Sequence, residues 1–346
     1  MNKKEKILGA LMGAAAGDAM GAATELFSTR QIYQHFGGPV HDFMTPPPGT
    51  LAEGRRAGQV TDAFSIPWIL CRHLLAAQGQ VSKKLGEDVL REWGESEWFQ
   101  PFAGMTTRKV VKRLFEDDRQ EMWSYSGHLG NKLFKSHYYA LSSNGAAVKA
   151  WPIGLLHPAD EESAIGDTLE ATLASHDDVL SVSGACAVAA AASRAMDKDS
   201  SVYDIIQSAF YGAEQGEKLA RERRDICTYP GPSTSARLEI AVDLAVRHGE
   251  NAMEPIRDLV GSGPAIAETV PAALGLLIAH KGQVLPALYD AVNIGDETAA
   301  IASLVGAIGG ASAGSSVFPE NYLTTIQREN SFDLEKMAEE FAAITA

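Results

Sequence analysis

Three acidic residues lie at the ends of segments that are predicted to be helical. Glu25 ends a run of small residues, and Asp62 opens an apolar segment. Glu297 opens a long uncharged run. A hydroxyl lies beside two of these acids, in Thr61 and Thr298. A group of carboxylates can act as general acids and bases or bind a hard cation such as Mg²⁺. The alternative is that each acid only caps a helix, because a helix dipole favours a carboxylate at its N-terminal end.

Residues 292–314 predict a buried central helix with Asp296 and Glu297 in its first turn. A second helix is predicted over residues 7–24, where Asp18 and Glu25, seven positions apart, should lie near one face. Both helices carry glycine at four-residue intervals: Gly306, Gly310 and Gly314 in the first, and Gly9, Gly13, Gly17 and Gly21 in the second. Each glycine inside a helix costs about 1 kcal/mol relative to alanine. Such a series is typical of close backbone contact, so we expect the two helices to be neighbours.

The remaining sequence consists of small-residue and amphipathic segments separated by Gly- and Pro-rich loops. No series of alternating apolar and polar residues indicates strands. We therefore expect an all-α, compact, orthogonally packed bundle that forms a single domain over residues 1–346. The uncharged run 298–318 is long enough to cross a membrane. Its Gly, Ala and Ser content favours burial within the protein instead, so we expect no membrane association.

The composition narrows the classes of partner. The net charge of −14 disfavours a nucleic-acid ligand, because phosphate backbones would be repelled. The three cysteines are far apart and form no CxxC or zinc spacing, which suits a reducing cytosol. The N-terminal run 1–17 loosely resembles a signal peptide, but its apolar part is mostly Ala and Gly. We expect a cytoplasmic protein whose ligand is a small molecule.

Two further segments could contact that ligand. The small-residue turn around Asn144, Gly145 and Ala146 should expose backbone N–H groups. His176 precedes two acids and an alanine-rich helix, where a structural hydrogen bond is the alternative to ligand contact. The aromatic-rich range 83–134 could stack on a flat ring or belong to the core.

Six motifs, taken in order, resemble the ADP-ribosylglycohydrolase family, which includes dinitrogenase-reductase-activating glycohydrolase and crystallin J1. Each motif alone is weak, but their order and spacing make the resemblance specific over nearly the whole chain. In chain order they read GAAAGDAMGAATE, GQVTD, SSNGAAVKAWPIG, ASHDDVLSVSGA, ETVPAALG and NIGDETAAIASLVGAIGGA. The resemblance implies a compact all-α bundle that hydrolyses an N- or O-glycosidic bond at the anomeric carbon of ADP-ribose.

The resemblance also implies which residues form the site. The family holds two Mg²⁺ ions, and its metal-binding positions correspond to Glu25, Thr61, Asp62, Glu297 and Thr298. Among these, Asp62, Glu25 and Glu297 are the expected catalytic residues, with Asp62 as base, Glu25 as its orienter and Glu297 as acid. The expected substrate contacts are Asn144, Gly145, Ala146, His176 and Asp18.

Several positions depart from the family pattern. Ala63 and Phe64 replace Asp and Thr, Ala299 and Ala300 replace a second Asp-Thr pair, and Val148-Lys149 replaces Met-Arg. Two Mg²⁺ ions carry four positive charges and need near-octahedral oxygen ligands. The family pattern supplies about five carboxylates and this chain keeps about three, plus Asp296 at most. We therefore expect no binuclear site. At most one Mg²⁺ ion would bind, and only weakly; the ligand count favours no bound metal.

Two functions remain open at this point, beside a structural, crystallin-like role with neither ligand nor turnover. The first is an N-glycosyl hydrolase that acts on an ADP-ribosyl or related ribosylated small molecule, using carboxylates with one or no Mg²⁺. The second is a catalytically inactive family member that binds a nucleotide, an ADP-ribose-like ligand or a partner protein. The sequence leaves the substrate, its leaving group and the oligomeric state open.

Overall fold

The structure is a computed structural model that describes residues 1–116 and 142–345, and in this part of the chain it is all-α, as expected. Pairing of the β type is limited there to three isolated bridges. The helices are α1 (Lys3–Gly21), α2 (Thr29–Phe36), α3 (Asp62–Ala76), α4 (Lys83–Gly94), α5 (Phe99–Phe102), α6 (Met105–Glu116), α8 (Trp151–Leu156), α9 (Glu161–Thr172), α10 (Val179–Ala195), α11 (Val202–Glu222), α12 (Thr234–His248), α13 (Met253–Leu259), α14 (Ile266–Ala279), α15 (Val284–Asn293), α16 (Thr298–Ala313), α17 (Glu320–Asn330) and α18 (Leu334–Ile344), with 3₁₀ turns η2 (Asn144–Ala146), η3 (Gly249–Asn251) and η4 (Ser315–Val317).

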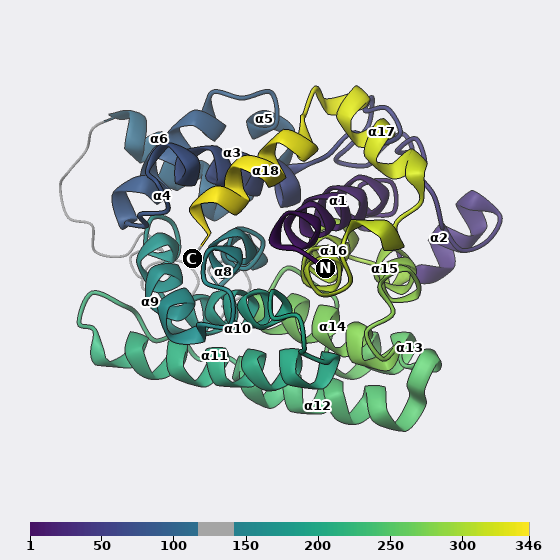
Figure 1. The fold of residues 1–346 in the computed structure, drawn as a ribbon. Helices are drawn as coiled ribbons and strands as arrows, with labels where there is room; N and C mark the ends of the chain where they lie inside the picture. The colour runs from purple at the N-terminus through teal and green to yellow at the C-terminus, as the bar shows by residue number, and fades with distance from the viewer. Residues whose placement is uncertain (117–141, 346) are drawn as a thin grey trace.

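The helices cross one another rather than running in one direction. In Figure 1, α16 is seen almost along its axis, whereas α11 and α12 run across the view beneath it. Helix α1 packs along α16, α10 packs on α11, and α12 packs on α14. This arrangement confirms the expected orthogonal bundle. One hydrophobic core cluster includes residues from Ile7 near the N-terminus to Phe341 near the C-terminus.

The predicted contact between the two glycine-rich helices is confirmed. A Cβ atom on Gly13 would lie 2.1 Å from the carbonyl oxygen of Gly306, and one on Gly306 would lie 2.0 Å from that of Gly13. Gly9 and Gly310 form a second reciprocal pair, in which the corresponding distances are 2.3 and 2.1 Å. The two backbones therefore touch directly, and no residue other than glycine fits at these four positions without a shift.

The ends of these helices differ from the prediction in three places. Helix α16 begins at Thr298, with Glu297 as its N-cap, so Asp296 lies outside the helix with a φ of 62°. Gly314 is the C-cap of α16 with a φ of 80°, so it terminates the glycine series instead of continuing it. Helix α1 ends at Gly21, so Glu25 lies in the following turn and shares no helical face with Asp18. Turn residues competed locally with the helical pattern at each of these ends.

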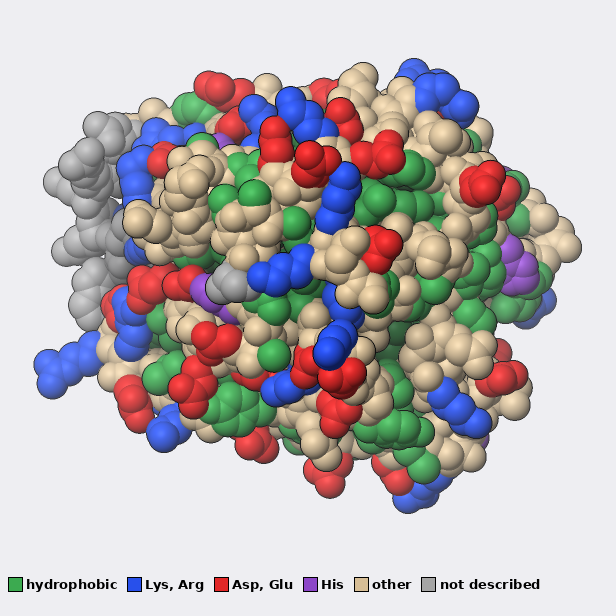
Figure 2. Space-filling view, in the orientation of Figure 1, with side chains coloured by type: hydrophobic (Ala, Val, Ile, Leu, Met, Phe, Trp, Pro, Cys, Tyr) green, Lys and Arg blue, Asp and Glu red, His purple; other side chains and the backbone are tan. Residues whose placement is uncertain are grey.

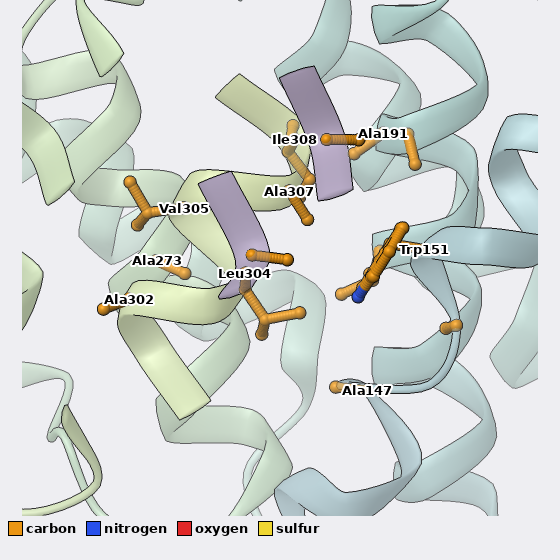
Figure 3. Close-up of a cluster of buried hydrophobic side chains, with 14 of the residues drawn as sticks. Ala147, Trp151, Ala191, Ala273, Ala302, Leu304, Val305, Ala307 and Ile308 are labelled. Atoms are coloured by element: carbon orange, nitrogen blue, oxygen red, sulfur yellow. The ribbon is translucent and has the colours of Figure 1, made fainter. Parts of the chain in front are cut away.

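The uncharged run forms α16 at the centre of the protein. Figure 3 shows Leu304, Ala307 and Ile308 of α16 beside Trp151 of α8 and Ala191 of α10. All five of these side chains are almost completely buried. The expectation that this run lies within the protein is confirmed for residues 298–311, whereas Ser316 and Val317 near its end are exposed. None of the helices in the described residues combines the length and the apolar character that a membrane crossing needs.

Lys6 links the C-terminal ends of two core helices. Its Nζ atom donates to the carbonyl oxygens of Ala195 at the end of α10 and Ala311 near the end of α16, at 2.8 and 3.2 Å. A cation at this place is favoured by the negative ends of both helix dipoles. The side chain is 3% exposed, and its burial lowers the pKa of Lys6.

Pro67 lies inside α3, as expected from the sequence, and leaves the carbonyl of Ala63 without its helical N–H partner. Ser303 of α16 compensates, because its Oγ atom donates to that carbonyl oxygen at 3.2 Å. This bond also connects the first turn of α3 to α16. The polar groups of the two helices that begin at the acidic motifs are therefore mutually satisfied.

Most aromatic side chains in the described part of the range 83–134 pack in or against the core, whereas Phe115 is exposed. Trp93 is fully buried, donates to Ser65 Oγ at 2.9 Å and packs edge-on against Phe99. Trp98 packs against Phe332. Positions 117–134 of that range lie outside the described residues. On the face drawn in Figure 2, acidic and basic side chains are interspersed, and the basic ones form no single large patch.

Replacing Gly13 by alanine should destabilise the protein strongly. The added methyl group would overlap the Gly306 carbonyl, so α1 and α16 must separate, which costs about 2 kcal/mol or more. Gly166→Ala on α9 is the matched control, because a Cβ atom there meets nothing within 4 Å and alanine should gain up to about 1 kcal/mol. Thermal unfolding checks both changes. Equal Tm values for the two variants would contradict the close backbone contact.

Candidate functional site

The turn that follows α1 and the turn that precedes α16 are hydrogen-bonded to each other, which brings Glu25 to the start of α16. The Leu26 N–H donates to the Asp296 carbonyl at 2.8 Å, and the Asp296 N–H donates to the Phe27 carbonyl at 3.0 Å. Thr24 donates its hydroxyl proton to the Val292 carbonyl at 2.7 Å. These bonds fix the turn after α1 against the turn before α16. Glu25 and Glu297 are thereby placed on adjoining turns.

Asp18 positions the third acidic segment. Its side chain is 0% exposed and accepts hydrogen bonds from the backbone N–H groups of Thr61 and Phe64, both at 2.8 Å. It also accepts the Thr61 hydroxyl proton at 2.5 Å. Thr61 is the N-cap residue of α3, but the capping carboxylate comes from α1. Asp18, an expected substrate contact, is thus engaged in holding the helix that begins with Asp62.

The structure brings Glu25, Asp62 and Glu297 together. Burial, together with the charges of Asp18 and Glu297, raises the pKa of Asp62 to about 8. Burial, followed by the charges of Glu297 and Asp62, raises the pKa of Glu25 well above its usual value. The pKa of Glu297 is also raised by burial, but a hydrogen bond from Asn144 opposes that rise. The three carboxyl groups therefore compete for ionisation, and Glu297 is the one with a favourable donor.

The turn that contains Asn144 contacts this cluster directly. The Asn144 Nδ2 atom lies 2.9 Å from Glu297 Oε2 and 3.2 Å from Thr269 Oγ1. Its backbone N–H donates to the Pro264 carbonyl at 2.9 Å, which anchors η2 beside α14. Gly145 is partly exposed, whereas Ala146 is fully buried. Of the three expected contacts in this turn, Asn144 and Gly145 therefore have exposed surface and the Ala146 side chain has none.

His176 lies behind the same turn. Its ring is 0% exposed, and a Cβ atom on Gly145 would lie 3.5 Å from its Cε1 atom. Its Nε2 atom is 2.9 Å from Ser143 Oγ, and its Nδ1 atom is 2.8 Å from Ser175 Oγ. Ser143 and Ser175 were not among the site residues predicted from the sequence. Ser143 directly precedes Asn144, and Ser175 directly precedes His176. This adjacency to two predicted site residues was the only sequence signal that could have indicated them.

The residues present do not fit a pair of Mg²⁺ ions. Ala63 and Ala300, at two positions where the family has Asp and Thr, pack with Val148 in a small buried apolar cluster. The Thr298 hydroxyl donates to the Gly21 carbonyl at 2.9 Å and its oxygen lies 3.0 Å from Thr24 Oγ1, so it is committed to joining α1 to α16. Within residues 1–116 and 142–345, no group of three or more His, Cys, Asp or Glu side chains has metal-binding geometry.

The comparisons agree with the fold and the motifs. A family model described as ADP-ribosylglycohydrolase matches residues 1–346. The chain therefore belongs to the ADP-ribosylglycohydrolase family, a family of hydrolases. The uncharacterized protein YegU of Escherichia coli (strain K12) is 30% identical over 344 residues, which are 97% of this chain and 96% of that protein.

Two further matches extend this result. An uncharacterized protein of Archaeoglobus fulgidus is 25% identical over 320 residues, which are 92% of this chain and 91% of that protein. A solved structure of an ADP-ribosylglycohydrolase-related protein complex superposes with a TM-score of 0.67 and 18% sequence identity, over 99% of both chains. This last likeness establishes the fold.

Replacing Asp62 by asparagine should raise the Tm more at pH 8 than at pH 5. The pKa of Asp62 is about 8 in the folded protein and near 3.8 in the unfolded chain. The folded state thus holds a proton that the unfolded state has released, so this group's stabilising contribution is lost as the pH rises towards 8. Asparagine does not ionise, so the variant does not lose this stability as the pH rises. Thermal unfolding at the two pH values measures the difference.

Asp160→Asn is the control, because the pKa of Asp160 is shifted in the direction opposite to that of Asp62. Hydrogen bonds from Ser163 lower the pKa of Asp160, so its ionised form is favoured in the fold. Its replacement should bring no gain in Tm at pH 8. An equal Tm gain for Asp62→Asn at both pH values would contradict the raised pKa.

Proposed function

We propose that this protein is an N-glycosyl hydrolase that cleaves the bond between ribose and a leaving group in an ADP-ribosyl or related ribosylated small molecule, without a metal pair. One observation carries the proposal. Asn144 holds Glu297 beside Asp62 and Glu25, while the positions of the missing family acids are filled by apolar contacts. Carboxylates remain, in different protonation states, and these are what glycoside hydrolysis requires.

The hydrogen bond from Asn144 supports a division of roles opposite to the one expected from the sequence. It favours the ionised form of Glu297, whose charge in turn raises the pKa of Glu25 and Asp62. Glu297 is then the base, and Asp62 is the acid that carries a proton near neutral pH. Glu25, whose pKa is also raised, orients Asp62 and limits the negative charge of the cluster.

The reaction follows from these protonation states. Asp62 gives its proton to the leaving nitrogen as the bond from that nitrogen to the anomeric carbon breaks. The ribose passes through an oxocarbenium-like state, which the negative charge of Glu297 stabilises. Glu297 takes a proton from a water molecule whose oxygen bonds to the anomeric carbon. The products are the free sugar and the protonated leaving group, and a proton returned from Glu297 to Asp62 restores the site.

A panel of ribosyl conjugates tests this proposal. N-linked conjugates of ADP-ribose with guanidine and amide groups, an O-linked conjugate and N-ribosyl nucleosides are incubated with the protein, and products are identified by mass spectrometry. We expect turnover of at least one conjugate, with equal rates in Mg²⁺ and in EDTA. Loss of all turnover in EDTA would show that the reaction needs a metal ion, which would contradict the steps described here, in which carboxylates alone act.

Asp62→Asn and Glu297→Gln should each lower kcat for the conjugate that is turned over by about 10²-fold to 10⁴-fold, the usual contribution of general acid–base catalysis. Glu339→Gln is the control, because this exposed glutamate only pairs with Lys4 at 2.7 Å. Its kcat should equal that of the wild type. If no conjugate is turned over and thermal shift shows stabilisation by ADP-ribose, the protein is a binding member of the family and the hydrolase proposal fails.

A further inference from the structure

A chain of hydrogen bonds runs from a buried lysine to the turn at the candidate site. Lys149 donates from Nζ to Ser175 Oγ, and Ser175 Oγ lies 2.8 Å from His176 Nδ1. On the other side of the ring, His176 Nε2 lies 2.9 Å from Ser143 Oγ. Lys149, Ser175 and His176 are all at least nine-tenths buried, whereas Ser143 is partly exposed. Ser143 directly precedes Asn144, the residue that holds Glu297.

The direction of each bond follows from the donors available. A protonated lysine has three N–H donors and no acceptor, so Ser175 Oγ must accept from it. The single hydroxyl proton of Ser175 is then free to donate to Nδ1 of His176. Burial and the charge of Lys149 hold the pKa of His176 well below its usual value, so the ring is neutral and carries one proton. That proton resides on Nε2 and donates to Ser143 Oγ.

The consequence appears at the exposed end of the chain. Ser143 Oγ accepts from the imidazole, so its own hydroxyl proton is available for another acceptor. No acceptor for that proton is found among the described residues. Gly145 lies next to this hydroxyl and has no side chain to cover it. A Cβ atom at position 145 would lie 3.5 Å from Ser143 Oγ. A ligand oxygen that approaches the turn would meet the Ser143 O–H group.

Lys149 has no carboxylate partner to explain its burial. Its one side-chain contact in the described part of the chain is Ser175, and burial lowers the pKa of Lys149 to about 7. A buried cation without a counter-charge is costly in a fold. A cation in this place is useful if its N–H groups determine how the hydrogen bonds beyond it are oriented.

We propose that Lys149 is a positioning residue: through Ser175 it fixes the Nε2–H tautomer of His176, and this tautomer makes Ser143 a hydrogen-bond donor to an acceptor oxygen of the ligand. The tautomer is a property of the unliganded protein and does not depend on catalysis. The ligand contact rests on the proposed function, because it assumes that the ribosylated ligand lies against the turn at Ser143.

The tautomer is measured by long-range ¹H–¹⁵N NMR of the ¹⁵N-labelled protein at about pH 6, where Lys149 is charged. His176→Gln assigns the ring signals among the nine histidines. We expect the Nε2–H form in the wild type. In Lys149→Met and in Ser175→Ala the donor to Nδ1 is lost or unoriented, so the Nδ1–H form should appear. Lys149→Arg keeps a cationic donor at this position and should retain the Nε2–H form.

Two results would overturn the positioning role: an Nδ1–H tautomer in the wild type, or an unchanged tautomer in both Lys149→Met and Ser175→Ala. The wild-type spectrum alone is decisive if a variant fails to fold. Far-ultraviolet circular dichroism of each variant serves as the folding control.

Binding of ADP-ribose, measured by calorimetry, tests the ligand contact. Ser143→Ala should weaken binding by about 10-fold to 100-fold, the range for a hydrogen bond to a charged group. Lys149→Met should weaken it comparably, and the double variant should add little, because both changes remove one interaction. Unchanged binding in Ser143→Ala would refute the donor role. A wild type that binds no ADP-ribose refutes the proposed ligand class, while the tautomer measurement still decides the role of Lys149.

Discussion

The direct backbone contact between α1 and α16 is the constraint on which the rest of the structure depends. Glycines face glycines across this pair, so the ends of the two helices lie closer than side chains would permit. The hydroxyl oxygens of Thr24 and Thr298 then both lie within hydrogen-bond distance of the Gly21 carbonyl and of each other. Because the end of α1 and the start of α16 are joined here, the turns that carry Glu25 and Glu297 adjoin.

The acidic cluster is held together by interactions that are mostly structural. Asp18 caps α3 from α1, and Ser303 of α16 satisfies the carbonyl that Pro67 leaves unpaired. These contacts place Asp62 beside the other two acids. The like charges and partial burial that result are unfavourable for folding, which is typical of sites where protonation states are arranged for chemistry.

Membership of a family defines the fold and the broad class of reaction, but the residues of this chain narrow its chemistry. The apolar cluster of Ala63, Val148 and Ala300 occupies positions where an oxygen-rich site would be needed for two divalent ions. Among the carboxylates that persist, Asp18 accepts hydrogen bonds from Thr61 and Phe64, and Glu297 accepts one from Asn144. This selective retention is the physical basis for proposing carboxylate chemistry in place of metal chemistry.

The sequence by itself determined the all-α fold, the contact between the glycine-rich helices and the acids of the candidate site, because four-residue spacing and local motifs encode these features. It misplaced both ends of α16, where turn geometry at Asp296 and Gly314 prevailed, and the end of α1, which stops at Gly21 before the turn that carries Glu25. Only the tertiary structure decided that Asp18 caps α3, a helix that begins 44 residues further along the chain, and that Asn144 favours the ionised form of Glu297. Hydrogen bonds between distant segments depend on how the helices pack, and no local pattern records that packing.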